Sequence, residues 1–582
     1  MPSTKEAVLL VWSRHVPSES AQDPLGLNLR GLTRIASQLL FCITSITPRA
    51  RYYSFLPWCV YDWQLREQDR PHATGLRDGI TLRERGLVLS CVAHHQGQPC
   101  VGGALVGTSE AKKWYGTGNT TADLDALSLT QTPAFDAYFN SLVNLGLFKT
   151  DQEQSVSADD DSESPPPSFD DLELTPLGIK IAEGYDAVVG ALPVIEALSK
   201  PPRRVALGAL STWGECGGLC ELSRPDAVDR EALIDVFFAR VPLPGESHCL
   251  RRKSLLLLLE LSRKTSRAGV GLDEPRFQSA AYYGEFSSDD EKRIDFSVPT
   301  QLQDISMRWR MFYFHHYMGV ALEGLFGWIS TNAFDRGLRG ITFAEAVGRL
   351  SEPSVAAVVE ELFGWTLEKP FSESLPIDLL QSISGSREID PESAEQLDRE
   401  CRPDTLFSEE RIEERIRSME HLRSAVGLAL PMILLVVTLA RYARWEGSLF
   451  GNWLANSAVD PRVDLVPPVL TRDMRLRFGA WWKSSWSELT DYVLHRYVVR
   501  QHLAMAYEKT TAGDRCILET DNSRIYSHNE YRWINLENPR FRSAVRILKD
   551  VAFLQELDGV GSVLTPEGER FLDAELLLEQ NP

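Results

Sequence analysis

The sequence predicts a mainly α, multidomain protein. Long runs place apolar residues at the spacing of amphipathic helices, the strand signals are few and short, and two polar segments interrupt the chain. At 582 residues the chain is several times the usual length of one domain. Its content of 43% hydrophobic and 24% charged residues is ordinary for a globular protein that can build a core.

Residues 1–185 are predicted to form an N-terminal helical region. The stretches 29–46, 51–65 and 81–97 carry apolar or aromatic residues at helical spacing. The segment 151–173 then holds nine acidic residues, three consecutive prolines and no Lys or Arg. Because such a composition cannot bury enough apolar surface to order itself, we expect a disordered acidic loop there.

The rest of the chain divides into two further helical regions. Residues 186–383 are predicted to form a central helical domain, and the polar stretch 384–404 is predicted to be a linker. Residues 405–582 form a C-terminal helical region, which starts with Ser408 followed by acidic residues, a helix-start pattern.

One apolar run, 425–440, invites a membrane interpretation. It is shorter than the ~20 residues that a spanning helix needs, Pro431 interrupts it, and Arg441 and Arg444 follow it closely. We therefore predict a buried core helix and no membrane partner. The first 20 residues lack the basic and apolar regions of a signal peptide, and the nine cysteines are scattered, so we expect a reduced, cytoplasmic protein.

Two sequence clusters carry residue types that bind metals. One comprises Cys216, Cys220, His248 and Cys249, and the other Cys91, His94, His95 and Cys100. Neither has the two closely spaced ligand pairs that are typical of a structural zinc site. From the sequence we therefore assign no metal ligand and no cofactor.

A repeated motif, Leu-Thr-Pro-x-Gly, occurs at 174–178 and again at 564–568. Before each copy, starting near Pro133 and Pro539, an amphipathic helix leads into a short apolar strand and a loop. In each motif Thr is suited to cap a following helix and Pro to occupy its first turn. The order helix, strand, turn, strand, helix resembles the second half of a winged-helix domain. The alternative is two unrelated helix–hairpin–helix segments.

The two copies differ in charge. The helix of the first copy carries Asp136 and no Lys or Arg before Lys149, and its loop is acidic, which favours packing or partner contact over DNA binding. The helix of the second copy carries four basic residues, namely Arg540, Arg542, Arg546 and Lys549. The last three are spaced i, i+4, i+7 and share one face, which suits phosphate contacts. A solvated basic face is the alternative.

A basic and aromatic stretch adds to the predicted DNA surface. The whole chain has a net charge of −20, so any contact with nucleic acid must be local. Arg475, Arg477 and Lys483 are interleaved with tryptophans at 481, 482 and 486, a pattern that can bind backbone and stack on bases. The alternative is that these tryptophans belong to the core. For Arg49 and Arg51, in a second basic-aromatic stretch, we favour structural pairing around a core.

No recognised catalytic motif is present: the sequence lacks a phosphate-binding P-loop, a nucleophile elbow and a zinc-protease signature, so no catalytic residue is assigned. The segments "GLTRIASQLLFCITSITPRARYYSFLPWCVYDW" and "NPRFRSAVRILKDVAFLQELDGVGSVLTPEGERFL" resemble uncharacterised bacterial proteins encoded beside restriction or anti-phage genes. The resemblance implies a DNA-sensing or assembly subunit and assigns no active residue. Together with the basic helix of the second copy, it leads us to expect a non-catalytic DNA-binding or DNA-sensing subunit of a defence complex, whose partners are double-stranded DNA and other subunits. The alternatives are an interaction scaffold that uses both winged-helix-like segments as docking surfaces, and a nuclease with an unrecognised active site.

Overall fold

The structure is a computed structural model. It describes residues 23–68, 75–98, 104–128, 133–149, 172–384, 408–418, 420–443, 465–510, 516–521, 523–531, 534, 536 and 539–579. Most of the predicted acidic loop and of the predicted linker lies outside these residues. Their described ends are ordered, because Glu173 belongs to a strand and Ser384 ends a helix.

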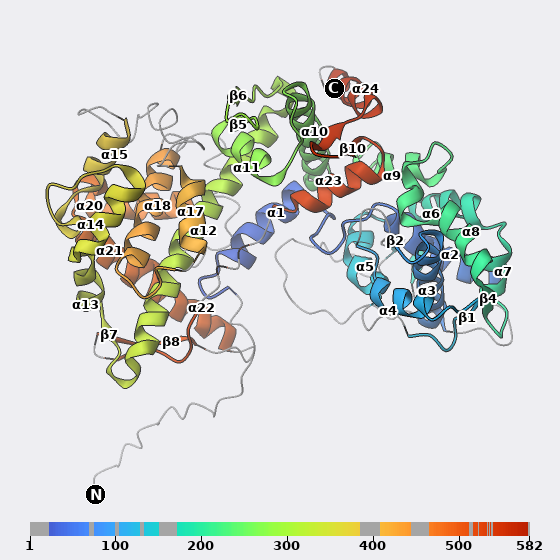
Figure 1. Ribbon diagram of the computed structural model, residues 1–582, viewed down its shortest axis with the longest axis horizontal. Coiled ribbons are helices and arrows are strands. Elements are labelled where there is room, and N and C mark those ends of the chain that lie inside the picture. The colour runs from blue at the N-terminus through green and yellow to red at the C-terminus, as the bar shows by residue number, and fades with distance from the viewer. Residues whose placement is uncertain are drawn as a thin grey trace, which may run out of the picture.

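Helices dominate the described residues, as the sequence predicts. Figure 1 shows two helical lobes, one on each side, with further helices between them at the top of the view. The strands are only two to four residues long. They form four two-stranded sheets and one three-stranded sheet among the described residues. The mainly α fold class is therefore confirmed.

The first lobe is built from helices of the N-terminal region. Helix α2 (Tyr52–Arg66) packs against α6 (Pro176–Val189), and α3 (Leu76–His94) packs against α8 (Leu207–Gly217). A Cβ on Gly86 would lie 2.4 Å from the Trp213 ring, so this glycine lets α3 and α8 approach closely. The smaller elements are α4 (Thr108–Gly116), α5 (Ala134–Asn144), α7 (Pro193–Leu198), α9 (Asp229–Phe237), η3 (Leu219–Ser223), and the paired strands β1 (Thr121–Asp123) and β4 (Arg204–Ala206).

The second lobe surrounds the longest helix, α12 (Gln303–Arg336). This helix packs against α18 (Val426–Ala443) and α17 (Glu409–Arg417), and its side chains from Met311 to Ala333 are all buried. The remaining elements are α13 (Phe343–Gly348), α14 (Pro353–Phe363), α15 (Pro376–Ser384), α20 (Pro467–Phe478), α21 (Trp486–Val493), α22 (Arg500–Thr510) and a sheet of β7 (Ile341–Thr342), β9 (Arg524–Ser527) and β8 (Leu518–Asp521), in that order.

Helix α18 contains the apolar run in question. Its 18 residues have a mean hydropathy of 1.9, enough by length and composition to cross a membrane, and 89% of them are buried inside the protein. The helix packs against α12 and α17, which cover its apolar surface. The prediction of a buried core helix is confirmed.

The two Leu-Thr-Pro-x-Gly motifs adopt the same local structure. In each, the threonine Oγ1 accepts the N–H of the motif glycine, at 3.1 Å for Thr175 and Gly178 and at 3.0 Å for Thr565 and Gly568. The backbone amides of the two threonines also donate, each at 3.0 Å, to the carbonyl that precedes the first strand of the hairpin. Both threonines are N-caps with proline in the first turn, as predicted.

Each motif closes a helix–hairpin–helix segment. The first repeat runs from α5 through β2 (Phe148–Lys149) and β3 (Glu173–Leu174) to α6. The second repeat runs from α23 (Phe541–Asp550) through β10 (Leu554–Leu557) and β11 (Gly561–Leu564) to α24 (Pro566–Leu578). The predicted order of elements is confirmed in both copies, and the winged-helix resemblance stays an interpretation.

The second repeat packs back onto earlier parts of the chain. It lies between the lobes in Figure 1, beside α1 (Arg34–Leu39), α10 (Glu246–Arg267) and α11 (Glu274–Tyr283). Phe571 packs edge-on against Phe238, with ring centroids 4.6 Å apart. Five ion pairs join α24 to the earlier chain: Arg230–Glu567, Arg240–Glu575, Arg252–Glu575, Arg263–Asp573 and Arg267–Glu569.

Two predicted domain boundaries differ from the structure. The predicted C-terminal region 405–582 is divided in space, because its end docks on the N-terminal and central regions while its beginning lies in the second lobe. The boundary predicted between residues 185 and 186 falls inside helix α6. Sequence composition does not reveal such long-range docking, because it depends on side chains that are hundreds of residues apart.

Candidate nucleic-acid interface

Helix α23 carries the basic face that the spacing predicts. Seven of its ten residues are buried, and the three that are not are Arg542, Arg546 and Lys549, which we call the α23 stripe. The stripe is partly neutralised by neighbours. Arg542 pairs with Glu274 of α11 at 2.9 Å, and Lys549 pairs with Glu556 of β10. Arg546 lies within electrostatic reach of Glu556, whose pKa is lowered first by its hydrogen bond with Lys549.

Arg540 does not belong to this stripe. It precedes α23 with a left-handed backbone (φ 55°) and is 6% exposed. Its Nη1 donates to the carbonyl of Ile43 at 3.1 Å, so the side chain fastens the start of α23 to the N-terminal region. The prediction of Arg540 as a DNA contact is therefore wrong for this conformation, because a buried guanidinium cannot reach a phosphate.

The second predicted set, Arg475, Arg477 and Lys483, lies on α20 and the short turn η8 (Trp481–Lys483). Arg477 and Lys483 are exposed and Arg475 is half-buried. The tryptophans between them are 1%, 9% and 0% exposed, so they belong to the core and cannot stack on bases. Figure 1 places α20 in the left lobe and α23 between the lobes, so the two predicted sets do not form one surface.

The arginines of the N-terminal aromatic stretch are structural, as favoured from the sequence. Arg49 and Arg51 are fully buried. Arg49 Nε lies 2.9 Å from Asp550 Oδ2, at the end of α23, and Arg51 pairs with Asp229 of α9. Neither is available for a phosphate.

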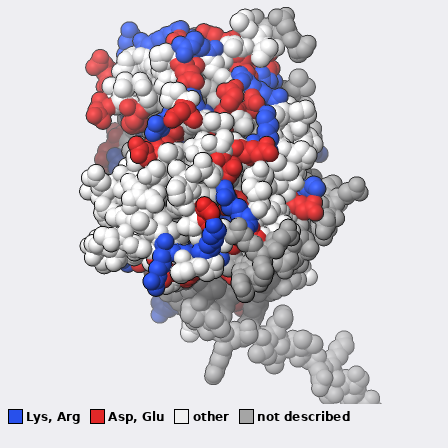
Figure 2. Space-filling model, turned by 90° about the vertical axis from the view of Figure 1, so that its right-hand side faces the viewer, with Lys and Arg blue, Asp and Glu red and all other residues white. Residues whose placement is uncertain are grey.

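On the face of the first lobe that Figure 2 displays, neither basic nor acidic side chains predominate. Basic and acidic side chains are interspersed over its upper part, and uncharged side chains cover a broad area below them. Interspersed charges of this kind do not attract a polyanion over a long range.

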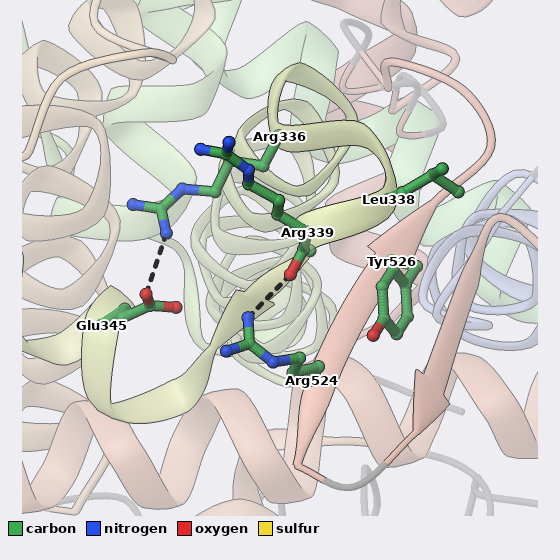
Figure 3. Close-up of a pocket in the computed structure, with 7 residues that line it drawn as sticks. Arg336, Leu338, Arg339, Glu345, Arg524 and Tyr526 are labelled. Carbon is green, nitrogen blue, oxygen red and sulfur yellow. Dashed lines mark hydrogen bonds and ion pairs between the residues drawn. The ribbon is translucent and has the colours of Figure 1, made fainter.

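A basic pocket lies instead at the far end of α12. It has a volume of about 510 Å³ and is lined by Arg336, Leu338, Arg339, Gly340, Glu345, Arg524 and Tyr526, which we call the arginine pocket. Figure 3 shows Arg336 and Arg339 extending from the end of α12 and the following turn, while Arg524 reaches toward this turn from β9.

The backbone turn that builds the pocket depends on two glycines. Gly337 and Gly340 have φ values of 54° and 55°, a left-handed region that glycine adopts without strain. They place Arg339 and the fully exposed Leu338 at the tip of the turn. Arg524 Nη1 donates to the Arg339 carbonyl at 2.7 Å, which fixes β9 to the turn.

The charges in the pocket are unbalanced. Its one carboxylate, Glu345, pairs with Arg336 at 3.2 Å. Hydrogen bonding to the backbone of Thr342 holds the pKa of Glu345 below its ordinary value, so this group is ionised at neutral pH. Arg339 and Arg524 have no carboxylate partner among the described residues. Two guanidinium groups thus remain for an anion, for which their planar forks are suited.

This pocket was not predicted from the sequence. Its cations come from segments about 190 residues apart in the chain, so no spacing rule connects them. The local signal was the run "DRGLRG", in which two glycines bracket an exposed leucine and arginine at the end of a long helix.

Comparison with known proteins gives no further assignment. The chain matches no protein-family model, no curated protein and no solved structure.

Proposed function

We propose that the chain is a non-catalytic, cytoplasmic DNA-binding subunit of a bacterial anti-phage or restriction-type complex. We further propose that it holds the phosphate backbone of double-stranded DNA at the arginine pocket. The observation that carries the proposal is the convergence of three guanidinium groups, with a single carboxylate, on one surface pocket. Arginine forks at an exposed surface are the side chains that phosphate contacts use most effectively.

The position of the pocket supports this assignment. It lies at the end of α12 with Leu338 fully exposed beside it, so a polymer can approach without first opening the fold. By contrast, two residues of the α23 stripe already pair with carboxylates of the same chain, Glu274 and Glu556. A phosphate there would compete with these carboxylates, whereas at Arg339 and Arg524 it would meet no such competitor among the described residues.

The test compares two triple variants of the full chain. The first replaces the pocket arginines (Arg336→Ala, Arg339→Ala, Arg524→Ala), and binding to a fluorescent DNA duplex is followed by anisotropy. Because each charge-assisted contact contributes about 1.5–3 kcal/mol, we expect affinity to fall at least about tenfold. Arg524→Lys, which keeps the charge and loses the fork, should weaken binding less.

The matched control neutralises the α23 stripe (Arg542→Ala, Arg546→Ala, Lys549→Ala). It changes the same number of cations on another surface and should leave affinity within about threefold of the wild type, because only the non-specific field changes. If the stripe variant loses binding and the pocket variant does not, the DNA surface is α23. If the wild type binds no duplex at low salt, the DNA-binding proposal is wrong.

A second candidate function is an interaction scaffold, and one observation favours it. The second repeat already serves as a protein-docking element, since its ion pairs and aromatic contacts fasten it to α9 and α10. The first repeat has the same capping geometry and a helix whose exposed Asp136 replaces the basic stripe. We infer that it would dock a basic partner subunit. Retention of neighbouring gene products after Asp136→Lys would contradict this role.

The nuclease alternative remains a hypothesis. Divalent-metal-dependent cleavage of DNA by the full chain would establish it, and resistance of a labelled duplex to prolonged incubation with Mg²⁺ or Mn²⁺ would count against it.

A further inference from the structure

The C-terminal end of helix α3 brings two histidines against a cysteine from a distant segment. His94 is the last residue of α3 and His95 is its C-cap, while Cys220 lies in the short helix η3. One ligand atom from each of these three residues lies within 4.8 Å of the other two. His95 Nε2 is 3.1 Å from Cys220 Sγ. All three side chains are half-buried, so an ion can reach them from solvent.

A fourth group completes the set. Glu221 Oε1 lies 3.3 Å from His94 Nε2 and 3.3 Å from Cys220 Sγ. In a tetrahedral zinc site with metal–ligand bonds of about 2.0–2.3 Å, neighbouring ligand atoms are about 3.3–3.6 Å apart. Three of the six distances, 3.1, 3.3 and 3.3 Å, are therefore close to the edges of such a tetrahedron. The other distances among His94, His95 and Cys220 lie within 4.8 Å, so these side chains would have to move toward a common centre to hold an ion.

These ligands come from the two sequence clusters that looked insufficient separately. The structure takes two histidines from one cluster and the cysteine from the other. The remaining described members are outside the set: Cys91 is fully buried, Cys216 on α8 is half-buried, Cys249 is exposed on α10, and His248 Nδ1 is 3.0 Å from an Arg251 nitrogen. The fold thus provides the second ligand pair whose absence argued against a zinc site.

The backbone around the cluster allows α8 and η3 to lie close to the end of α3. A Cβ on Gly214 would lie 2.2 Å from the Ser90 carbonyl oxygen and 2.7 Å from His94 Cβ, so only glycine lets α8 and the following η3 come this close to the end of α3. Arg51 Nη1 donates to the Gly218 carbonyl at 2.8 Å, which fixes the turn before Cys220.

We propose that His94, His95, Cys220 and Glu221 form a binding site for a divalent transition-metal ion of the zinc class. Imidazole, thiolate and carboxylate together suit Zn²⁺, which takes mixed nitrogen, sulfur and oxygen ligands in tetrahedral geometry. Arg224, 3.5 Å from the second carboxylate oxygen of Glu221, orients that ligand.

The site has a structural role. The ion fastens the end of α3 to η3, and η3 is the platform against which α23 packs. The carbonyl of Leu219, next to the ligand Cys220, accepts Arg49 Nη2 at 2.7 Å, and Arg49 in turn pairs with Asp550 at the end of α23. Metal binding would therefore stabilise the docking of the second repeat.

The first test uses the wild-type full chain. After removal of metal by a chelator, the protein is reloaded with Zn²⁺ or Co²⁺ alone, dialysed and analysed for bound metal. We expect one ion per chain and, with Co²⁺, tetrahedral ligand-field bands together with a thiolate-to-cobalt charge-transfer band. Zn²⁺ should also protect Cys220, but not the exposed Cys249, from alkylation mapped by mass spectrometry.

The variants decide which residues bind the ion. Cys220→Ser should abolish the charge-transfer band and weaken binding about 100-fold or more, since loss of a direct ligand costs at least as much as loss of an orienting partner. Cys216→Ser, a neighbouring half-buried cysteine outside the ligand set, is the control and should keep the band. Substoichiometric metal in the reloaded wild type, or unchanged alkylation of Cys220 with Zn²⁺, shows that the cluster is held by hydrogen bonds alone and overturns the proposal.

Discussion

The buried ion pair between Arg49 and Asp550 gives the sharpest prediction about the architecture. Arg49 is fully buried, and the Asp550 side chain is 7% exposed. Asp550 Oδ2 accepts both Arg49 Nε and the Ala50 N–H, each at 2.9 Å. This carboxylate joins the first residues of the first lobe to the last turn of α23. We predict that Asp550→Ala selectively destabilises the packing of the second repeat against the rest of the protein.

The size of the expected loss in stability follows from the burial of this ion pair. The substitution leaves a guanidinium buried without its counter-charge and an amide without its acceptor, and breaking one partner of a buried ion pair costs about 3–5 kcal/mol. Asp550→Asn keeps an acceptor oxygen and should cost less, about 1.5–3 kcal/mol. Arg49→Met combined with Asp550→Leu should recover part of the loss, because no charge is then left unpaired, although the Ala50 N–H and the Leu219 carbonyl each lose a partner.

The assay is native-state hydrogen exchange resolved along the chain. A loss of 3–5 kcal/mol in local stability should raise the exchange rates of amides in 541–578 on the order of 10²- to 10⁴-fold, while amides in α12 and α18 exchange as in the wild type. Arg542→Ala, which removes a pair on the same helix whose arginine is 88% exposed, should cost less than about 1 kcal/mol. Equal exchange in Asp550→Ala and the wild type would refute the view that this pair fastens the second repeat.

Two further predictions concern the repeats and a buried acid. In Gly178→Ala and Gly568→Ala the new Cβ would lie 2.1 Å and 2.4 Å from backbone carbonyl oxygens, so each substitution should lower the free energy of unfolding by about 1–3 kcal/mol. The control Gly208→Ala places its Cβ in open space and should not lower it. An unchanged free energy of unfolding in urea titrations of the first two variants would contradict the shared geometry. Burial raises the pKa of Glu84 from 4.5 to about 8, and its Oε1 accepts the Phe135 N–H. Because the folded state then binds more protons than the unfolded state between these pH values, stability falls as pH rises from about 4.5 to 8. Glu84→Gln should remove this pH dependence and raise the free energy of unfolding by up to about 4 kcal/mol near pH 8. If denaturant titrations of the variant show the same pH dependence as the wild type, Glu84 is not its cause.

Local features were predictable from the sequence because they depend on neighbouring residues. The threonine caps, the proline in the first turn and the one-sided spacing of the α23 stripe all follow from helix geometry. The burial of 425–440 was predicted from its length, Pro431 and the arginines that follow it, and the structure shows that packing against α12 and α17 provides this burial.

Features that depend on tertiary contact were not predictable. Arg540 lies only two residues before Arg542, yet its left-handed backbone turns it toward Ile43 and into the core. The arginine pocket and the His94–Cys220 cluster each join segments more than 100 residues apart. A composition or spacing rule cannot bring such residues together, because only the packing of α12 against its sheet, or of α3 against η3, does so.

The salt dependence of duplex binding tests the central claim most directly. Each phosphate neutralised by a cation contributes about 0.9 to the slope of log affinity against log salt concentration. If the arginine pocket binds the backbone, replacing its three arginines should lower the magnitude of this slope by about 2–3, and neutralising the α23 stripe should leave it near the wild-type value. An unchanged slope in the pocket variant, measured on protein with wild-type helix content, would contradict the proposal that this pocket holds DNA.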